Sequence, residues 1–85
     1  MKRQEKVCVL SKQLSKFYRI HRNALRSLIV QNLDIHDAHS VNSWIFRLQA
    51  KGFLETDLTS LTPTGKPSSK TFYLVNKQKC EDATQ

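Results

Sequence analysis

The chain has 85 residues, a length that suits one domain, and its 14 lysines and arginines against 7 acidic residues give a formal net charge of +7. This basic balance favours a polyanionic partner, either nucleic acid or an anionic membrane surface. Only two glycines and two prolines occur, which excludes a low-complexity or disordered chain.

No segment has the features of a membrane anchor or a signal peptide. No apolar run approaches the roughly 20 residues that span a bilayer, and the basic start MKRQEK is followed only by a short apolar run at residues 7–10. We therefore expect a cytoplasmic protein with no membrane partner. Cys8 and Cys80 are expected to be reduced thiols, and a disulfide between the C-terminal tail and the first helix is the alternative.

Two amphipathic helices are predicted in the first part of the chain, over about residues 4–17 and residues 22–33, because apolar residues recur there at helical spacing. Residues 18–21 between them are predicted to form a brief strand or a turn. The apolar residues of the first helix are Val7, Leu10, Leu14 and Phe17, and those of the second are Leu25, Leu28, Ile29 and Leu33.

The third predicted helix has both ends marked in the sequence. After a short turn at residues 34–36, the carboxylate of Asp37 can accept hydrogen bonds from the free N–H groups of the first helical turn. The helix then runs to about Lys51, where Gly52 supplies the left-handed C-terminal position. Helical periodicity directs one cluster of apolar residues toward the core, namely Val41, Trp44, Ile45 and Leu48.

After this helix the period of the pattern changes from 3.6 toward 2. Residues 53–58 and 71–75 are predicted to be strands, joined by a turn-rich loop over residues 59–69 that contains PTGKPSS. Residues 77–85 are polar, and we expect a flexible tail there. The sequence thus predicts one α+β domain over residues 1–85, with its core in about residues 5–76: three helices followed by a two- or three-stranded sheet.

This order of elements, and the stretch SLIVQNLDIHDAHSVNSWIFRLQAKGFLE, resemble the winged-helix superfamily of DNA-binding regulators. The likeness is to small MarR-like and ArsR-like regulators and to compact winged-helix proteins of archaeal viruses. It covers about residues 5–76, and its most specific part is Arg47-Leu48-x-x-Lys51-Gly52-Phe53-Leu54 followed by a basic hairpin. The resemblance implies a viral or prokaryotic regulator with a winged helix-turn-helix fold, a three-helix core with a C-terminal β-hairpin wing. Its recognition helix would span about residues 38–51 and its wing about residues 59–70.

In helix-turn-helix proteins the N-terminal part of the recognition helix enters the major groove. Asn can contact adenine bidentately, Arg can contact guanine in the same way, and Ser can bond to several base edges. The alternative is the solvated polar face of an ordinary surface helix. The candidate base-reading residues are His39, Ser40, Asn42, Ser43 and Arg47.

Four basic residues are candidates for phosphate contacts. Arg22 and Arg26 lie early in the second helix, where the resembled family contacts the DNA backbone. Lys66 and Lys70 lie in residues 63–70, the expected tip and end of the wing loop, where lysines supply charge without reading the sequence. The alternative for the loop is an ordinary solvated hairpin tip.

Phe46 departs from the family pattern, which usually has a polar residue at this position. On a DNA-facing surface it can touch a thymine methyl group, but it can also pack against the first helix or contact a partner protein. Of these we expect local packing.

Metal binding and catalysis are not expected. His36 and His39 are close in sequence, but a closed zinc site needs three or four ligands, and the cysteines lack CxxC spacing. The sequence has no nucleophile motif and no phosphate-binding loop, so we expect neither an enzyme nor a cofactor. Asp34 and Asp37 are better explained as turn and cap residues.

The leading hypothesis is a sequence-specific double-stranded DNA-binding transcriptional regulator. Such proteins commonly bind as dimers to two half-sites about one helical turn apart. We expect a homodimer formed through the first helix, which carries Cys8 and Tyr18 near its apolar stripe. The alternatives are a winged-helix protein–protein interaction module, to which an exposed Phe46 would be suited, and a nonspecific nucleic-acid-binding protein.

Overall fold

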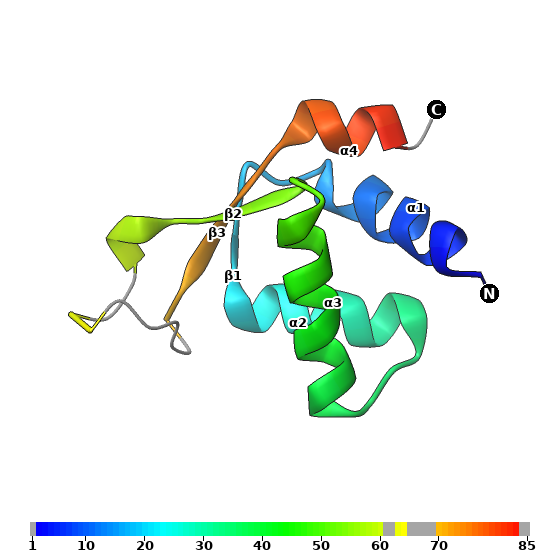
Figure 1. Ribbon diagram of the computed structural model, residues 1–85, viewed down its shortest axis with the longest axis horizontal. Coiled ribbons are helices and arrows are strands. Elements are labelled where there is room, and N and C mark those ends of the chain that lie inside the picture. Colours follow the sequence, from blue (N-terminus) through cyan, green and yellow to red (C-terminus); the bar gives the residue numbers. More distant parts are fainter. Residues whose placement is uncertain (1, 61–62, 65–69, 84–85) are drawn as a thin grey trace.

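The computed structural model describes residues 2–60, 63–64 and 70–83, and within them the chain forms the expected α+β fold. Four α-helices and a three-stranded antiparallel sheet make up this described part, and one end of the sheet extends beyond the helices (Figure 1). The helices are α1 (Arg3–Leu14), α2 (Arg22–Leu33), α3 (Ala38–Ala50) and α4 (Lys77–Ala83), and the strands are β1 (Arg19–His21), β2 (Leu54–Thr56) and β3 (Phe72–Val75).

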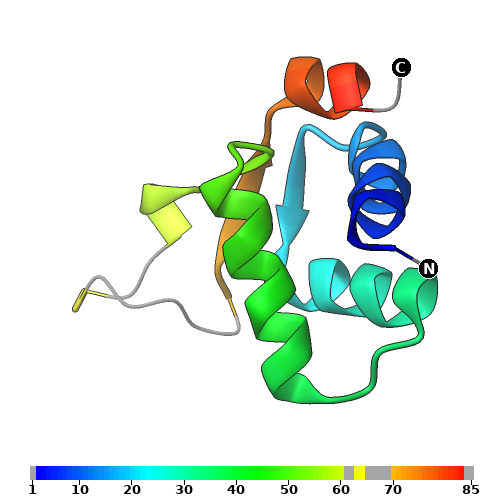
Figure 2. The ribbon, with the colours of Figure 1, turned by 45° about the vertical axis from the view of Figure 1, so that its right-hand side comes forward.

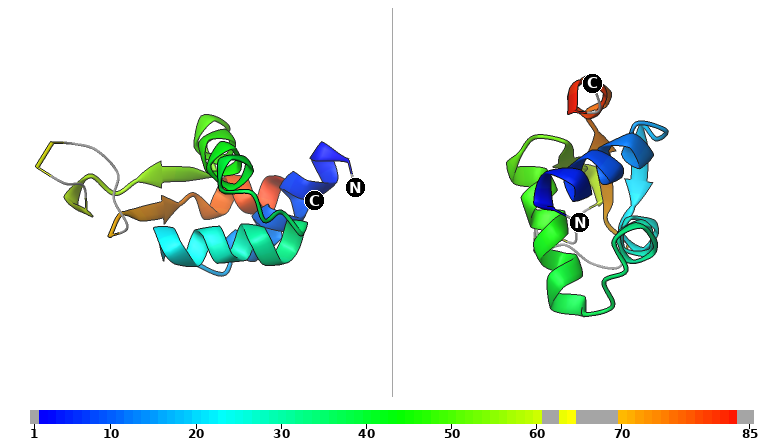
Figure 3. Two further views of the ribbon diagram at one scale, coloured as in Figure 1. Left: turned by 90° about the horizontal axis from the view of Figure 1, so that it is seen from below. Right: turned by 90° about the vertical axis from the view of Figure 1, so that its right-hand side faces the viewer.

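β3 lies in the centre of the sheet, between β1 and β2. Ile20 pairs with Tyr73, and Leu54 pairs with Val75, so that these side chains share the face that meets the helices. Ile20, Leu54 and Tyr73 are each at most 3% exposed. Seen from below, β2 and β3 extend away from the helices to one side of the molecule (Figure 3).

The second and third helices are where the sequence predicted them. α2 spans the predicted residues and ends at Asp34, which adopts a left-handed φ of 54° and begins the predicted turn. All four residues predicted for the buried face of α3 are in the core, with exposed fractions of 0–5%. No helix in the described part of the chain is long and apolar enough to cross a membrane.

Both ends of α3 have the predicted caps. The Asp37 carboxylate accepts a hydrogen bond from the Ser40 N–H at 2.8 Å. At the other end Gly52 has a φ of 85°, the Gly52 N–H donates to the Gln49 carbonyl, and the Phe53 N–H donates to the Leu48 carbonyl. This pair of bonds is the Schellman arrangement, which reverses the chain and leads it directly into β2.

The first helix is shorter than predicted, because the strand that follows it needs the intervening residues. α1 ends at Leu14, and the hydroxyl of Ser15 after it donates a hydrogen bond to the Lys12 carbonyl at 2.7 Å. The Tyr18 carbonyl then accepts from the Val75 N–H, which begins the pairing of β1 with β3. Phe17, predicted to lie on the apolar face of the helix, is therefore outside the helix and 38% exposed.

The first strand after α3 is also shorter than predicted. β2 ends at Thr56, and residues 58–60 form a short 3-10 helix, η1 (Leu58–Ser60). The returning strand β3 agrees with the prediction for residues 71–75. Most of the predicted loop between them lies outside the described residues.

The prediction of a flexible tail at residues 77–85 is wrong for residues 77–83, which form α4. The side chain of Asn76 accepts a hydrogen bond from the Lys79 N–H at 3.2 Å and so caps the first turn. Cys80 is completely buried, and α4 packs against α1 (Figure 2). Tertiary contact with α1 thus stabilises a segment whose composition is polar. Residues 84 and 85 lie outside the described part.

Candidate nucleic-acid interface

The face of α3 opposite the core forms an exposed strip along the helix. We define this outer strip as His39, Asn42, Phe46 and Ala50, which follow one another at spacings of three or four residues and are all exposed. Two of the candidate base-reading residues, His39 and Asn42, therefore lie on it. The amide of Asn42 has no hydrogen-bond partner in the described part of the chain, so both its donor and its acceptor face outward.

Phe46 lies in the middle of the outer strip and is 75% exposed. The expectation that it packs locally is wrong. The angular position of residue 46 turns it away from α1 and from the core that holds Trp44, Ile45 and Leu48. Of the three roles considered for Phe46, contact with a base and contact with a partner protein remain.

Ser40 serves the helix cap. Its N–H and its hydroxyl both donate to Oδ2 of Asp37, at 2.8 and 3.0 Å, and its side chain is half-buried. The two hydrogen bonds from Ser40 lower the pKa of the Asp37 carboxyl below its ordinary value. Ser40 thus holds the start of α3 in place, and Ser43, which is also half-buried, lies one turn further on.

Arg47 is held by an aromatic ring. Its guanidinium carbon lies 4.6 Å from the centroid of Trp44, and its side chain is half-buried. A cation over an aromatic face is attracted by the ring quadrupole. The guanidinium is therefore positioned before any ligand arrives.

Arg22 connects the start of α2 to the central strand. Its Nη1 donates to the hydroxyl of Tyr73 at 2.7 Å, and its backbone N–H donates to the Thr71 carbonyl at 2.8 Å. Arg26 follows one turn later and is half-buried. Neither arginine forms an ion pair with any residue that the structure describes. The charge of Arg22 therefore lies beside β3 without a described carboxylate to neutralise it.

Of the two lysines predicted to contact phosphates, only Lys70 lies within the described residues. Lys70 is exposed and lies two residues before β3. The prediction for Lys66 falls outside the described residues.

A polar network that the sequence did not indicate holds the base of the hairpin. The Nε of Arg19 donates to Oδ2 of Asp57 at 2.9 Å, and the guanidinium stacks over Phe72 at 3.7 Å. The hydroxyl of Thr59 donates to Oδ1 of Asp57, and with Arg19 it lowers the pKa of that carboxyl. The partners Arg19 and Asp57 are 38 residues apart, so that only the pairing of both outer strands with β3 brings them together.

A second contact sets the hairpin against α3. The side-chain amide of Gln49 donates to the hydroxyl of Thr56 at 2.7 Å. Gln49 lies in the last turn of α3 and Thr56 ends β2, so the bond spans the tight reversal at Gly52. Together with the Asp57 network it fixes the direction in which the hairpin leaves the helix.

The histidines do not assemble a metal site within the described residues. His36 lies against Asp34 at 2.9 Å in the exposed turn after α2. Nowhere in the described ranges do three or more His, Cys, Asp or Glu side chains gather as a group that could hold an ion. Both cysteines are free thiols, and burial raises the pKa of the Cys80 thiol.

Comparison of the chain with models of protein families, with curated proteins and with solved structures found no match.

Proposed function

We propose that the protein binds double-stranded DNA, with α3 as the recognition helix of a winged helix-turn-helix and the β2–β3 hairpin as its wing. The observation that supports this most directly is the division of α3. One side is buried in the core, while the other side exposes His39, Asn42 and Phe46. A helix of this kind fits the major groove, which admits one α-helix.

The positions of the polar side chains suit base contacts. Asn42 can donate to and accept from the same adenine edge, and the positioned Arg47 can donate two hydrogen bonds to guanine. His39 lies in the first turn of α3, the part that enters the groove most deeply in helix-turn-helix proteins. Phe46 would lie against a thymine methyl group.

Phosphate contacts belong to the arginines of α2 and to the hairpin. Arg22 and Arg26 are four residues apart and project from adjacent turns of one helix. The net charge of +7 would attract the duplex at long range, and the arginines would set the position of the protein along it. Regulation of transcription is part of the same proposal.

The homodimer through the first helix stays a prediction. α4 of the same chain already packs against α1 and completely buries Cys80. A second copy would therefore meet a surface made by both helices rather than by α1 alone.

Selection of bound sequences from a random duplex pool tests the proposal. We expect a preferred sequence to be enriched, and Asn42→Ala to lose part of that preference while keeping affinity for unrelated duplexes. Arg26→Ala should weaken binding to all duplexes and reduce the salt slope by about one unit, since one fewer counterion is released. Lys12→Ala, on the exposed side of α1, is the matched control and should change neither quantity.

Enrichment of no sequence, with equal affinity for unrelated duplexes, would indicate a nonspecific nucleic-acid-binding protein. Failure to retain any duplex at low salt would contradict the proposal as a whole.

The second candidate function is a protein-interaction module, and the exposure of Phe46 favours it. Aromatic residues that stand free on a surface often anchor protein interfaces. This alternative requires that Phe46→Ala abolish binding to a protein partner while DNA binding is absent in the wild type.

A further inference from the structure

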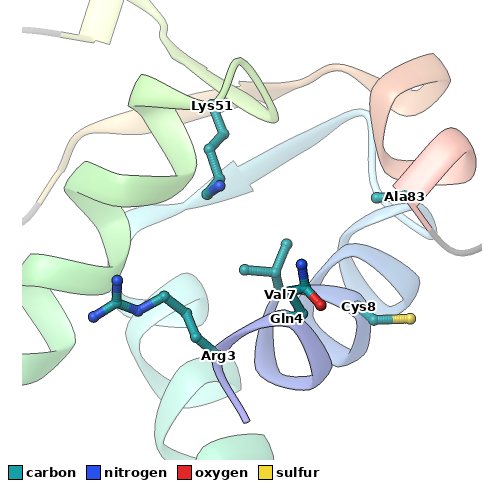
Figure 4. A pocket seen from close by; sticks show the side chains of 6 residues that line it. All are labelled: Arg3, Gln4, Val7, Cys8, Lys51 and Ala83. Carbon is teal, nitrogen blue, oxygen red and sulfur yellow. The ribbon is translucent and has the colours of Figure 1, made fainter.

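We propose that a pocket between α1, the C-terminal end of α3 and α4 binds a small organic anion that has a carboxylate head and a short apolar tail. The volume of the pocket is about 360 Å³, at the lower end of the roughly 300–1,000 Å³ usual for small-molecule sites. It is lined by Arg3, Gln4, Val7, Cys8, Lys51 and Ala83 (Figure 4). This site is separate from the outer strip of α3 and does not depend on the proposed DNA binding.

Two cations from different helices line one side of the pocket. Arg3 begins α1 and Lys51 follows the last residue of α3, and the close view shows both side chains directed into the space between these helices (Figure 4). Neither side chain forms an ion pair with a described residue, and no carboxylate is among the lining residues. A planar guanidinium matches the two oxygens of a carboxylate, and the lysine adds a second positive charge.

The other side of the pocket is apolar. Val7 and Ala83 are partly buried and pack against the hydrophobic core, and Cys8 beside them is a half-buried free thiol. Val7 of α1 and Ala83 of α4 border the space into which Lys51 extends, whereas the side chain of Cys8 points away from Lys51 (Figure 4). A pocket with charge at one end and apolar groups at the other fits a ligand divided in the same way. Inorganic phosphate would leave the apolar side unused.

An occupant of this pocket would contact three helices that are already linked. The Nζ of Lys79 in α4 donates to the carbonyl of Lys51, a residue that lines the pocket, at 3.3 Å. This bond connects α4 to the end of α3. Binding should therefore stabilise the docking of α4 on α1, because the ligand favours the folded arrangement over any in which α4 has separated.

Titration of the full chain with octanoate, below its micelle-forming concentration, tests the proposal. Isothermal calorimetry and amide NMR shifts should show saturable binding of one octanoate, with shifts in residues 3–8, 51 and 77–83. Octan-1-ol, which lacks the charge, and inorganic phosphate, which lacks the tail, should each bind about tenfold more weakly or worse.

Matched variants locate the site. Arg3→Gln and Lys51→Gln should each weaken octanoate binding about tenfold, because each removes one charged hydrogen-bonding group. Lys12→Gln removes a cation from the exposed side of α1 that does not line the pocket, and it should bind octanoate like the wild type.

Three results would overturn the proposal: no saturable octanoate binding, equal binding of octan-1-ol or phosphate, or unchanged binding by both pocket variants. Circular dichroism of each variant shows that it is folded. Because no DNA is present in these titrations, their failure is independent of any failure of DNA binding.

Discussion

The two faces of α3 use aromatic residues in opposite ways. Trp44 and Phe46 are two residues apart, yet Trp44 is 5% exposed and Phe46 is 75% exposed. Because successive helical positions are separated by about 100°, two residues of spacing move a side chain to nearly the opposite side of the helix. Angular position, and not the apolar character of the side chain, decides which aromatic enters the core. The apolar residue that remains outside is therefore a candidate for contact with a partner molecule.

The largest expected effect compares these two aromatics directly. Trp44→Ala should lower the free energy of unfolding by about 3–5 kcal/mol, because it leaves a cavity that the core cannot close. Phe46→Ala should change it by no more than about 0.5 kcal/mol, because little is packed against this ring. Urea unfolding of both variants measures the difference. Equal losses in the two variants would show that the assignment of the two faces is wrong.

The second prediction concerns Arg47, whose guanidinium lies over the buried Trp44 ring and is proposed to contact a base. Arg47→Ala should reduce affinity for the selected duplex by about 1–3 kcal/mol and hardly change affinity for random DNA. It also removes the cation from the Trp44 ring, so stability should fall by about 0.5–1 kcal/mol. Fluorescence anisotropy measures the first quantity and urea unfolding the second. A loss of stability without any loss of DNA affinity would show that Arg47 stabilises α3 but does not contact a base.

The third prediction tests how α3 is ended. Gly52→Ala should cost about 1–2 kcal/mol, because a side chain disfavours the left-handed φ of 85°. A Cβ at this position would also lie 2.7 Å from the Nζ of Lys79, although this flexible side chain can move away. Gly52→Asn, which tolerates the left-handed region better, should lose less stability. Equal thermal midpoints for the wild type and both variants would contradict the role of Gly52 as the turning point.

The smallest expected effect is at the start of α3, and it depends on pH. The pKa of Asp37 is lowered in the folded protein, so its contribution to stability is present above the ordinary pKa and is lost as pH falls through the folded value. The stability difference between the wild type and Asp37→Ala should therefore be full near neutral pH and shrink below about pH 4. Thermal melts from pH 7 to pH 2.5 measure it.

Asp37→Ser is the matched variant for this test, because serine keeps a capping oxygen that does not titrate. Its difference from Asp37→Ala should stay constant across the same range. A wild-type advantage over Asp37→Ala that is unchanged at pH 2.5 would show that the charge of the carboxylate contributes nothing to the cap.

Local pattern determined much of this fold. The residues of α2, the buried face of α3, the Asp37 cap and the left-handed Gly52 all follow from spacing and side-chain chemistry within one or two helical turns. Such features are decided by neighbours in the chain, so the sequence predicts them without knowledge of the rest of the molecule. The candidate base-reading residues came from their position on the predicted recognition helix and from their side-chain chemistry. The structure leaves His39 and Asn42 on the exposed strip and places Ser40 in the cap.

Contacts between distant segments decided the remainder. A helix of seven residues is too short to be stable alone, and α4 exists because Cys80 enters the core beside α1. Two local features of the sequence favour α4: Asn76, which caps its first turn, and the spacing of three residues between Cys80 and Ala83. The Arg19–Asp57 bond likewise depends on strands that pair across β3, and the pocket of Arg3 and Lys51 depends on three helices meeting. Periodicity specifies which face of an element is apolar, but only the packed chain specifies what that face meets.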